Sequence, residues 1–149
     1  LAMEILKKES AYDAEQFVNA PLQKFGEFFG TDIVLFTVID KWQKGLIAKN
    51  VTVEVEYIFK SVKTNQVIYQ RKGKIVYDTS VSSGAGGLAG LLINAAMSAV
   101  NTAVTKYVTV ARTCNDYTFA DLPAGKYSPQ AGLDGDVLAG PAEFTATLK

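Results

Sequence analysis

The sequence contains no histidine and a single cysteine, Cys114. Without histidine the chain lacks the commonest general base and metal ligand, and one cysteine allows neither an intrachain disulfide nor a CxxC metal site. We therefore expect no bound zinc, iron or other cofactor, and we interpret Cys114 as a small apolar residue of the core. Fifteen basic residues balance fifteen acidic ones without a basic cluster, so nucleic-acid binding is not expected.

Charged residues are also missing from residues 79–105. A glycine- and serine-rich joint is followed there by an apolar run that predicts a helix over residues 88–104. Three interpretations compete: a helix buried between the sheet and another element, a dimer seam, or a membrane contact. The apolar run has only about half the length that a transmembrane helix needs before polar residues intervene. The glycines at 84–90 are a weak phosphate-binding signal, because no second βαβ strand follows them.

Two apolar strips are distinguishable on the predicted helix at three-to-four spacing. The first is Leu88, Leu91, Leu92, Ala95 and Ala99, and the second is Ile93, Met97, Val100 and Val104. One strip can pack on the sheet, but the other would leave several hundred Å² of apolar surface uncovered. We therefore predict a homodimer that uses this helix, with the first strip as its interface, or the neighbouring sheet edge.

Three successive strands organise the middle of the chain. Residues 33–39 form a continuous β-branched run, which predicts a strand buried on both faces. Apolar and polar residues then alternate over 51–60, so we expect the odd-numbered residues to face the core and Glu54, Glu56 and Lys60 to face solvent. Between these two strands, residues 42–50 are expected to form a loop in which Trp42 is a packing anchor.

A turn at residues 63–65, with Asn65 in the left-handed region, leads to a third strand over 66–77. Lys72 and Lys74 are expected on its solvated face. These strands predict an α/β (α+β) fold with a small mixed or antiparallel sheet that contains a three-strand meander and carries helices on its faces. We expect residues 1–149 to form one domain.

The remaining segments are predicted as helices and a tail. Before the sheet we expect a helix over residues 1–9, a short turn capped by Asp13, and a helix capped by Asn19 and ended by Gly30. After the apolar helix, spacing of three to four residues predicts a further helix over 102–120. Residues 121–149 are expected to be loop-rich, with a short strand at 144–148.

Four ordered motifs are similar to those of a known family. They are Phe29-Gly30-Thr31-Asp32, Lys63-Thr64-Asn65-Gln66-Val67-Ile68-Tyr69, the more specific Gly86-Gly87-Leu88-Ala89-Gly90-Leu91-Leu92, and Leu122-Pro123-Ala124-Gly125-Lys126-Tyr127-Ser128-Pro129. In this order they resemble a family of bacterial lipoproteins of unknown function, typified by a meningococcal surface lipoprotein antigen. The family more usually has Gly and Trp at the positions of Asn65 and Tyr69. We expect the sequence to begin inside the family's domain, without its signal peptide, lipid-anchor cysteine and leading strands.

The resemblance implies a fold like that of the Tol translocation protein N-terminal domain and the curli-secretion lipoprotein. It also implies an outer-membrane lipoprotein that faces the periplasm or the surface, held by a lipid anchor outside this sequence, and it carries over no catalytic residue. We expect a non-enzymatic domain that acts through protein–protein contacts in envelope assembly or secretion, as a homodimer or with envelope proteins. The alternative is a secretion-pore component in which residues 84–100 contact the membrane, and a third class is an enzyme using Asp, Glu or Tyr.

Overall fold

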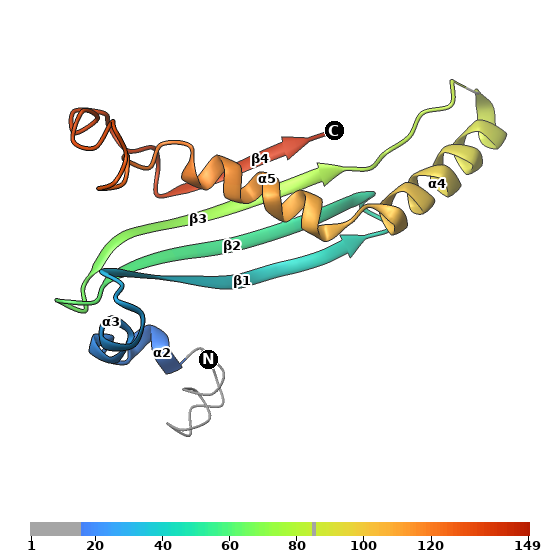
Figure 1. The fold of residues 1–149 in the computed structure, drawn as a ribbon. Coiled ribbons are helices and arrows are strands. Elements are labelled where there is room, and N and C mark those ends of the chain that lie inside the picture. The colour runs from blue at the N-terminus through green and yellow to red at the C-terminus, as the bar shows by residue number, and fades with distance from the viewer. Residues whose placement is uncertain (1–15, 85) are drawn as a thin grey trace. The chain divides into compact units, whose positions relative to one another are not determined.

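The structure, a computed structural model, describes residues 16–84 and 86–149. Within these residues, two helices, three strands, two further helices and a last strand follow one another (Figure 1). Their bounds are α2 (Gln16–Asn19), α3 (Gln23–Phe29), β1 (Ile33–Gly45), β2 (Asn50–Ser61), β3 (Val67–Asp78), α4 (Gly87–Val104), α5 (Tyr107–Phe119) and β4 (Glu143–Leu148). The helix expected over residues 1–9 and the cap expected at Asp13 lie outside the described residues.

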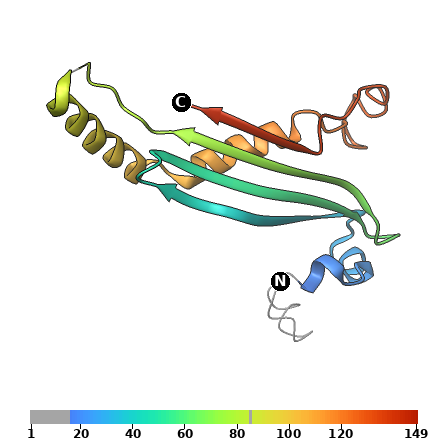
Figure 2. The same ribbon diagram turned by 180° about the vertical axis from the view of Figure 1, so that it is seen from behind.

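The strands form one four-stranded mixed sheet in the order β1-β2-β3-β4. Short turns join β1 to β2 and β2 to β3, which confirms the predicted meander, and Asn65 has the expected positive φ of 58°. β4 lies beside β3 (Figure 2) and is parallel to it, in a register that runs from Lys72 opposite Glu143 to Tyr77 opposite Leu148. A parallel neighbour needs a long crossover, which α4, α5 and the tail supply. The predicted fold class and the short C-terminal strand are therefore confirmed.

The described residues form two compact units, one from residues 16–37 with Tyr57–Gln70 and one from Val38–Glu56 with Arg71–Lys149. In the first unit, α2 and α3 cover even-numbered residues of β2. Leu22 is fully buried, and a Cβ added to Gly26 would lie only 2.7 Å from Cγ1 of Val62, so α3 closely approaches the turn that follows β2. Gly30 ends α3 as predicted, with a φ of 60° that favours glycine.

Two predictions for this unit are wrong. Lys60 is only 6% exposed, and its ammonium group donates a hydrogen bond to the carbonyl of Val18 at 2.6 Å. Lys60 lies on the same side of β2 as the apolar Ile58, and the helices cover that side. The ammonium group of Lys60 therefore bonds to a carbonyl and not to water. Asn19 ends α2 and does not cap α3, which begins after Leu22 with no side-chain cap.

In the second unit, α5 crosses one face of the sheet (Figure 1) and covers the odd-numbered residues of β3. On β2, the residues Val51, Val53 and Val55 are at most 3% exposed, which confirms the predicted register at these positions. Phe59, also expected to face the core, is only half-buried. The buried Cys114 lies on the inward side of α5, as a small core residue should. The chain is extended at Thr105 and Lys106, so the first residues of the helix predicted over 102–120 belong to α4 instead.

β1 is an edge strand, and the prediction that residues 33–39 are buried on both faces is wrong. Ile33, Leu35 and Ile39 are between 42% and 57% exposed. An apolar run indicates a strand, but it does not show whether other elements cover both faces of the sheet at that strand. β1 also continues to Gly45, so Trp42 lies in a strand and not in the predicted loop, and its ring stacks on that of Tyr107 with centroids 5.3 Å apart. Trp42 thus packs against the first residue of α5 but stays 41% exposed.

Candidate functional site

Helix α4 has a narrow polar strip along an otherwise apolar surface. Asn94, Ser98, Asn101 and Thr102 fall at spacings of four, three and one residues, so they share one side of the helix. Ser98 and Thr102 are fully buried, and each donates its hydroxyl proton to the carbonyl four residues earlier, at 2.7 and 2.8 Å. This strip was visible in the sequence as a set of interruptions in the apolar run, but the interruptions form the side of α4 that packs.

The polar strip packs against residues 79–83, which we call the strap. The backbone N–H of Val81 donates to the hydroxyl of Ser98 at 2.8 Å, and the N–H of Ser83 donates to the side-chain carbonyl of Asn94 at 2.7 Å. The side-chain amide of Asn101 donates to the carbonyl of Thr79 at 3.1 Å. Hydrogen bonds to a single extended segment therefore hold α4, where most helices are held by apolar packing.

The apolar residues of α4 face outward, which overturns the interpretation of a helix buried between the sheet and another element. Neither predicted strip packs on the sheet. The buried residues of α4 are Gly90, Ser98 and Thr102. The large apolar side chains of α4 are between 45% and 74% exposed: Leu88, Leu91, Leu92, Ile93, Met97, Val100 and Val104. Ordinary surface helices have the opposite distribution, so this surface requires another explanation.

The predicted interface residues share one exposed side of α4. Leu88 is 74% exposed, Leu91 63% and Leu92 64%. Ala95 is exposed as well, and Ala99 is half-buried. The structure thus brings the five residues together on one strip, which is open to a partner over the length of the helix.

The C-terminal end of α4 carries cations and aromatic rings. The ammonium group of Lys44 donates a hydrogen bond to the carbonyl of Ala103 and lies 5.3 Å from the centre of the Tyr107 ring. Tyr107 stacks on Trp42, whose side chain is 41% exposed. Lys106, also exposed, follows at the beginning of α5. A cation near the last carbonyls of a helix is favourable because those oxygens carry partial negative charge.

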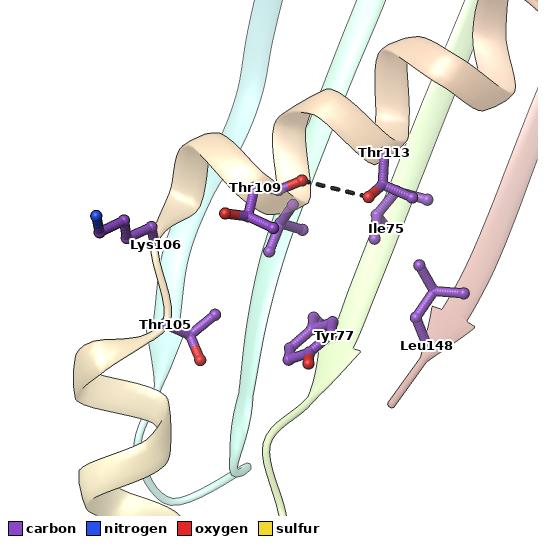
Figure 3. A pocket seen from close by; sticks show the side chains of 8 residues that line it. Ile75, Tyr77, Thr105, Lys106, Thr109, Thr113 and Leu148 are labelled. Atoms are coloured by element: carbon purple, nitrogen blue, oxygen red, sulfur yellow. Dashed lines mark hydrogen bonds between the residues drawn. The ribbon is translucent and has the colours of Figure 1, made fainter.

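A small pocket of about 230 Å³ lies where α4 gives way to α5, beside the ends of β3 and β4 (Figure 3). Its lining residues are Ile75, Tyr77, Thr105, Lys106, Thr109, Val110, Thr113 and Leu148. The hydroxyl of Thr113 donates to the carbonyl of Thr109 at 3.2 Å, and Lys106 extends away from Tyr77. The pocket therefore brings no pair of titratable groups together for acid–base chemistry.

The uncovered face of the sheet in the second unit carries an ion-pair network around Glu54. Its carboxylate lies 3.2 Å from Lys72, 3.6 Å from Lys41 and 4.0 Å from Lys74, and Lys72 also pairs with Asp40 at 2.8 Å. Hydrogen bonds from Lys72 to Asp40, and then to Glu54, raise the pKa of Lys72. The side chain of Glu54 is only 15% exposed, so its expected position in open solvent is wrong, whereas Lys72 and Lys74 are partly exposed as expected.

The loop-rich tail is fastened to the sheet by Arg71. This side chain is 4% exposed and donates two hydrogen bonds to Asp121, at 2.6 and 2.9 Å, and one to the carbonyl of Thr118 at 2.8 Å. The N–H of Gly140 also donates to Asp121. We call the Arg71–Asp121 pair the clasp. Its two charges neutralise each other through direct hydrogen bonds, which is typical of a structural ion pair and not of a reactive group.

Within residues 16–84 and 86–149, no group of three or more Cys, Asp or Glu side chains is placed to hold a metal ion. The described part of the chain has an α+β fold, and its most unusual surface is α4. The chain belongs to the GNA1162-like lipoprotein family, whose model matches residues 1–124. The resemblance seen in the sequence motifs is confirmed, and membership of a lipoprotein family associates the chain with the cell envelope.

Among solved structures, the crystal structure of lipoprotein GNA1162 from Neisseria meningitidis is similar to this chain. The two sequences are 19% identical, the alignment covers 70% of each chain, and the TM-score is 0.42. A comparison with curated proteins gives no match.

Proposed function

We propose that this chain is a non-enzymatic domain of an outer-membrane lipoprotein that acts through protein–protein contacts, and that its contact surface is α4. The observation that carries this proposal is the outward orientation of the apolar residues of α4. A monomer in water rarely leaves a contiguous apolar surface of this size open, because each exposed aliphatic side chain forgoes the free energy of leaving water.

The partner that this surface fits is a second copy of the chain. Eighteen residues give α4 a length of about 27 Å, and the first strip runs along most of it. Ala95 and Ala99 lie within the strip and let two helix backbones approach closely. An isologous pairing would place the same strip of each copy against the other. One helix on each side buries less than the roughly 800 Å² per partner of a standard interface, so we expect dissociation in the micromolar range.

Sedimentation velocity over micromolar concentrations tests the dimer. Leu91→Glu combined with Ala95→Glu should shift the protein to monomer and leave its far-UV circular dichroism unchanged. Leu133→Glu with Leu138→Glu is the matched control, because these leucines are 80% and 90% exposed in the tail and should not affect association. A wild-type protein that is monomeric throughout this range would disprove the dimer.

A secretion-pore component is the second candidate function, and one observation favours it. Within the part of the chain that the structure describes, α4 is the one helix long and apolar enough to cross a membrane. However, its polar strip is bonded to the strap. A crossing helix would have to release the strap or take that extended segment into the hydrocarbon, where unpaired backbone groups are costly. These contacts favour a helix that lies along a surface.

A further inference from the structure

A dimer formed through the first strip leaves the second strip of α4 open. The members of the second strip are Ile93, Met97, Val100 and Val104, which are 47%, 45%, 63% and 67% exposed. At 3.6 residues per turn they lie nearly opposite the first strip. A single partner helix therefore cannot cover both strips. Ala89, Ala96 and Ala103 are exposed between them, so the apolar surface extends around more than half of the helix.

The C-terminal end of α4, where the second strip ends at Val104, has the chemistry of a membrane interface. No charged side chain occurs in residues 79–105, whereas Lys44 and Lys106 lie where α4 ends. The stacked rings of Trp42 and Tyr107 lie at the same end. Tryptophan and tyrosine are enriched at the level of lipid headgroups, and lysine is attracted to anionic lipids. Cations, aromatic rings and an apolar helix thus meet in one place.

The strap makes a position along the bilayer surface possible. An interfacial helix needs an apolar side for the acyl chains and a satisfied polar side away from them. In α4 the polar side already has its hydrogen-bond partners in Thr79, Val81 and Ser83. The helix can therefore rest on lipid without breaking any contact described here.

We propose that the second strip of α4 rests in the plane of an anionic phospholipid surface, with Lys44 and Lys106 at the headgroups and Trp42 at their level. This contact goes beyond the proposed dimer, because it uses the other strip and does not depend on the first. The chain would then carry a second attachment to the membrane, distinct from any lipid anchor.

Vesicle flotation tests the contact, with protein lacking any lipid modification and two sets of vesicles. One set is phosphatidylcholine alone, and the other contains about one third phosphatidylglycerol. Wild type should float with the anionic vesicles and much less with the neutral ones. Met97→Gln with Val100→Gln should lower the apparent affinity at least about tenfold, since two aliphatic side chains leave the acyl region. Glutamine is chosen because it adds no charge that would repel the lipid.

Two further variants separate this contact from the dimer. Leu91→Gln with Ala95→Gln should abolish dimerisation while flotation persists, and Leu133→Gln with Leu138→Gln should behave as wild type in both assays. Lys106→Gln should weaken flotation a few-fold and make it less sensitive to salt. The proposal is overturned if wild type does not float with anionic vesicles. It is also overturned if the second-strip variant floats as well as wild type, or if that variant loses dimerisation and keeps flotation, which would make the strip a protein seam.

Discussion

Thr79 and Thr102 are joined by a hydrogen bond between their hydroxyl groups, and both side chains are fully buried. Thr102 gives its own proton to the carbonyl of Ser98 at 2.8 Å, so Thr79 must be the donor in the bond between them. This bond joins the beginning of the strap to the C-terminal half of α4. The attachment of the helix thus depends on hydroxyl groups that water cannot reach.

Replacing Thr102 with valine should destabilise the protein. The substitution keeps the shape of the side chain but leaves the Thr79 hydroxyl buried without its acceptor, which costs about 1–3 kcal/mol. Urea unfolding measures the loss. The double variant Thr79→Val with Thr102→Val should lose less than the sum of the two single variants, because no hydroxyl is then left without its partner. Strictly additive losses would show that the two hydroxyls do not interact in solution.

The clasp between Arg71 and Asp121 predicts a pH dependence of stability. Hydrogen bonds from Arg71, and then from the N–H of Gly140, hold the pKa of Asp121 at about 2, below its ordinary value of 3.8. As the pH falls, the unfolded chain takes up the proton first. The stabilisation from Asp121 is therefore complete above about pH 4 and is lost between about pH 4 and pH 2.

Asp121→Asn tests this dependence by unfolding in urea at several pH values. At pH 7 the variant should be less stable by roughly 3 kcal/mol, because the buried guanidinium of Arg71 loses its counter-charge. The difference from wild type should shrink as the pH falls toward 2. A difference that stays constant over this range would mean that Asp121 titrates alike in the folded and unfolded chain.

Val55→Asp should cost about 3–5 kcal/mol, because Val55 is 3% exposed and a carboxylate there would be buried without a partner. Ile47→Asp is the matched control, since Ile47 lies in the turn after β1 and is 99% exposed. Thermal melts of both variants provide the measurement. If Val55→Asp has the same melting temperature as wild type, the register of β2 is inverted.

Gly73 is a position where even a methyl group does not fit. A Cβ there would lie 2.5 Å from the ring of Phe144 and 2.9 Å from the sulfur of Cys114. We expect Gly73→Ala to destabilise by about 1–3 kcal/mol, and Phe144→Ala in the same chain to recover part of the loss by opening space. Gly135→Ala, with nothing within 4 Å, serves as the control. Equal stability of the Gly73 and Gly135 variants would contradict the close approach of β3, α5 and β4.

The sheet could be predicted from the sequence because its signals are local. The alternation of Val51, Val53 and Val55 with polar residues indicates the inward side of β2, and Asn65 marks its turn. The edge position of β1 could not be predicted, because it depends on which strands pair elsewhere in the chain. The burial of Lys60 is hidden for a similar reason: its charge predicts exposure, but α2 supplies the carbonyl of Val18 as a hydrogen-bond acceptor.

The surface of α4 shows a different limit of sequence reasoning. The spacing of Leu88, Leu91, Leu92, Ala95 and Ala99 predicts one side of a helix, and all five lie in α4, whereas the apolar composition predicts burial. Composition alone cannot show which side packs, since that depends on the strap. The polar residues at 94, 98, 101 and 102 held the missing information, because only they could pair with the backbone of an extended segment.

Cys114 provides a way to observe motion in this fold. As the only cysteine, it is fully buried on α5 beside Gly73, so a thiol reagent can reach it only when the helix separates from the sheet. The rate of labelling under native conditions therefore reports how often that separation occurs, without any engineered probe. If α4 engages a partner or a lipid surface while α5 stays in place, labelling should not accelerate. A faster labelling reaction on binding would show that α5 separates from the sheet together with α4.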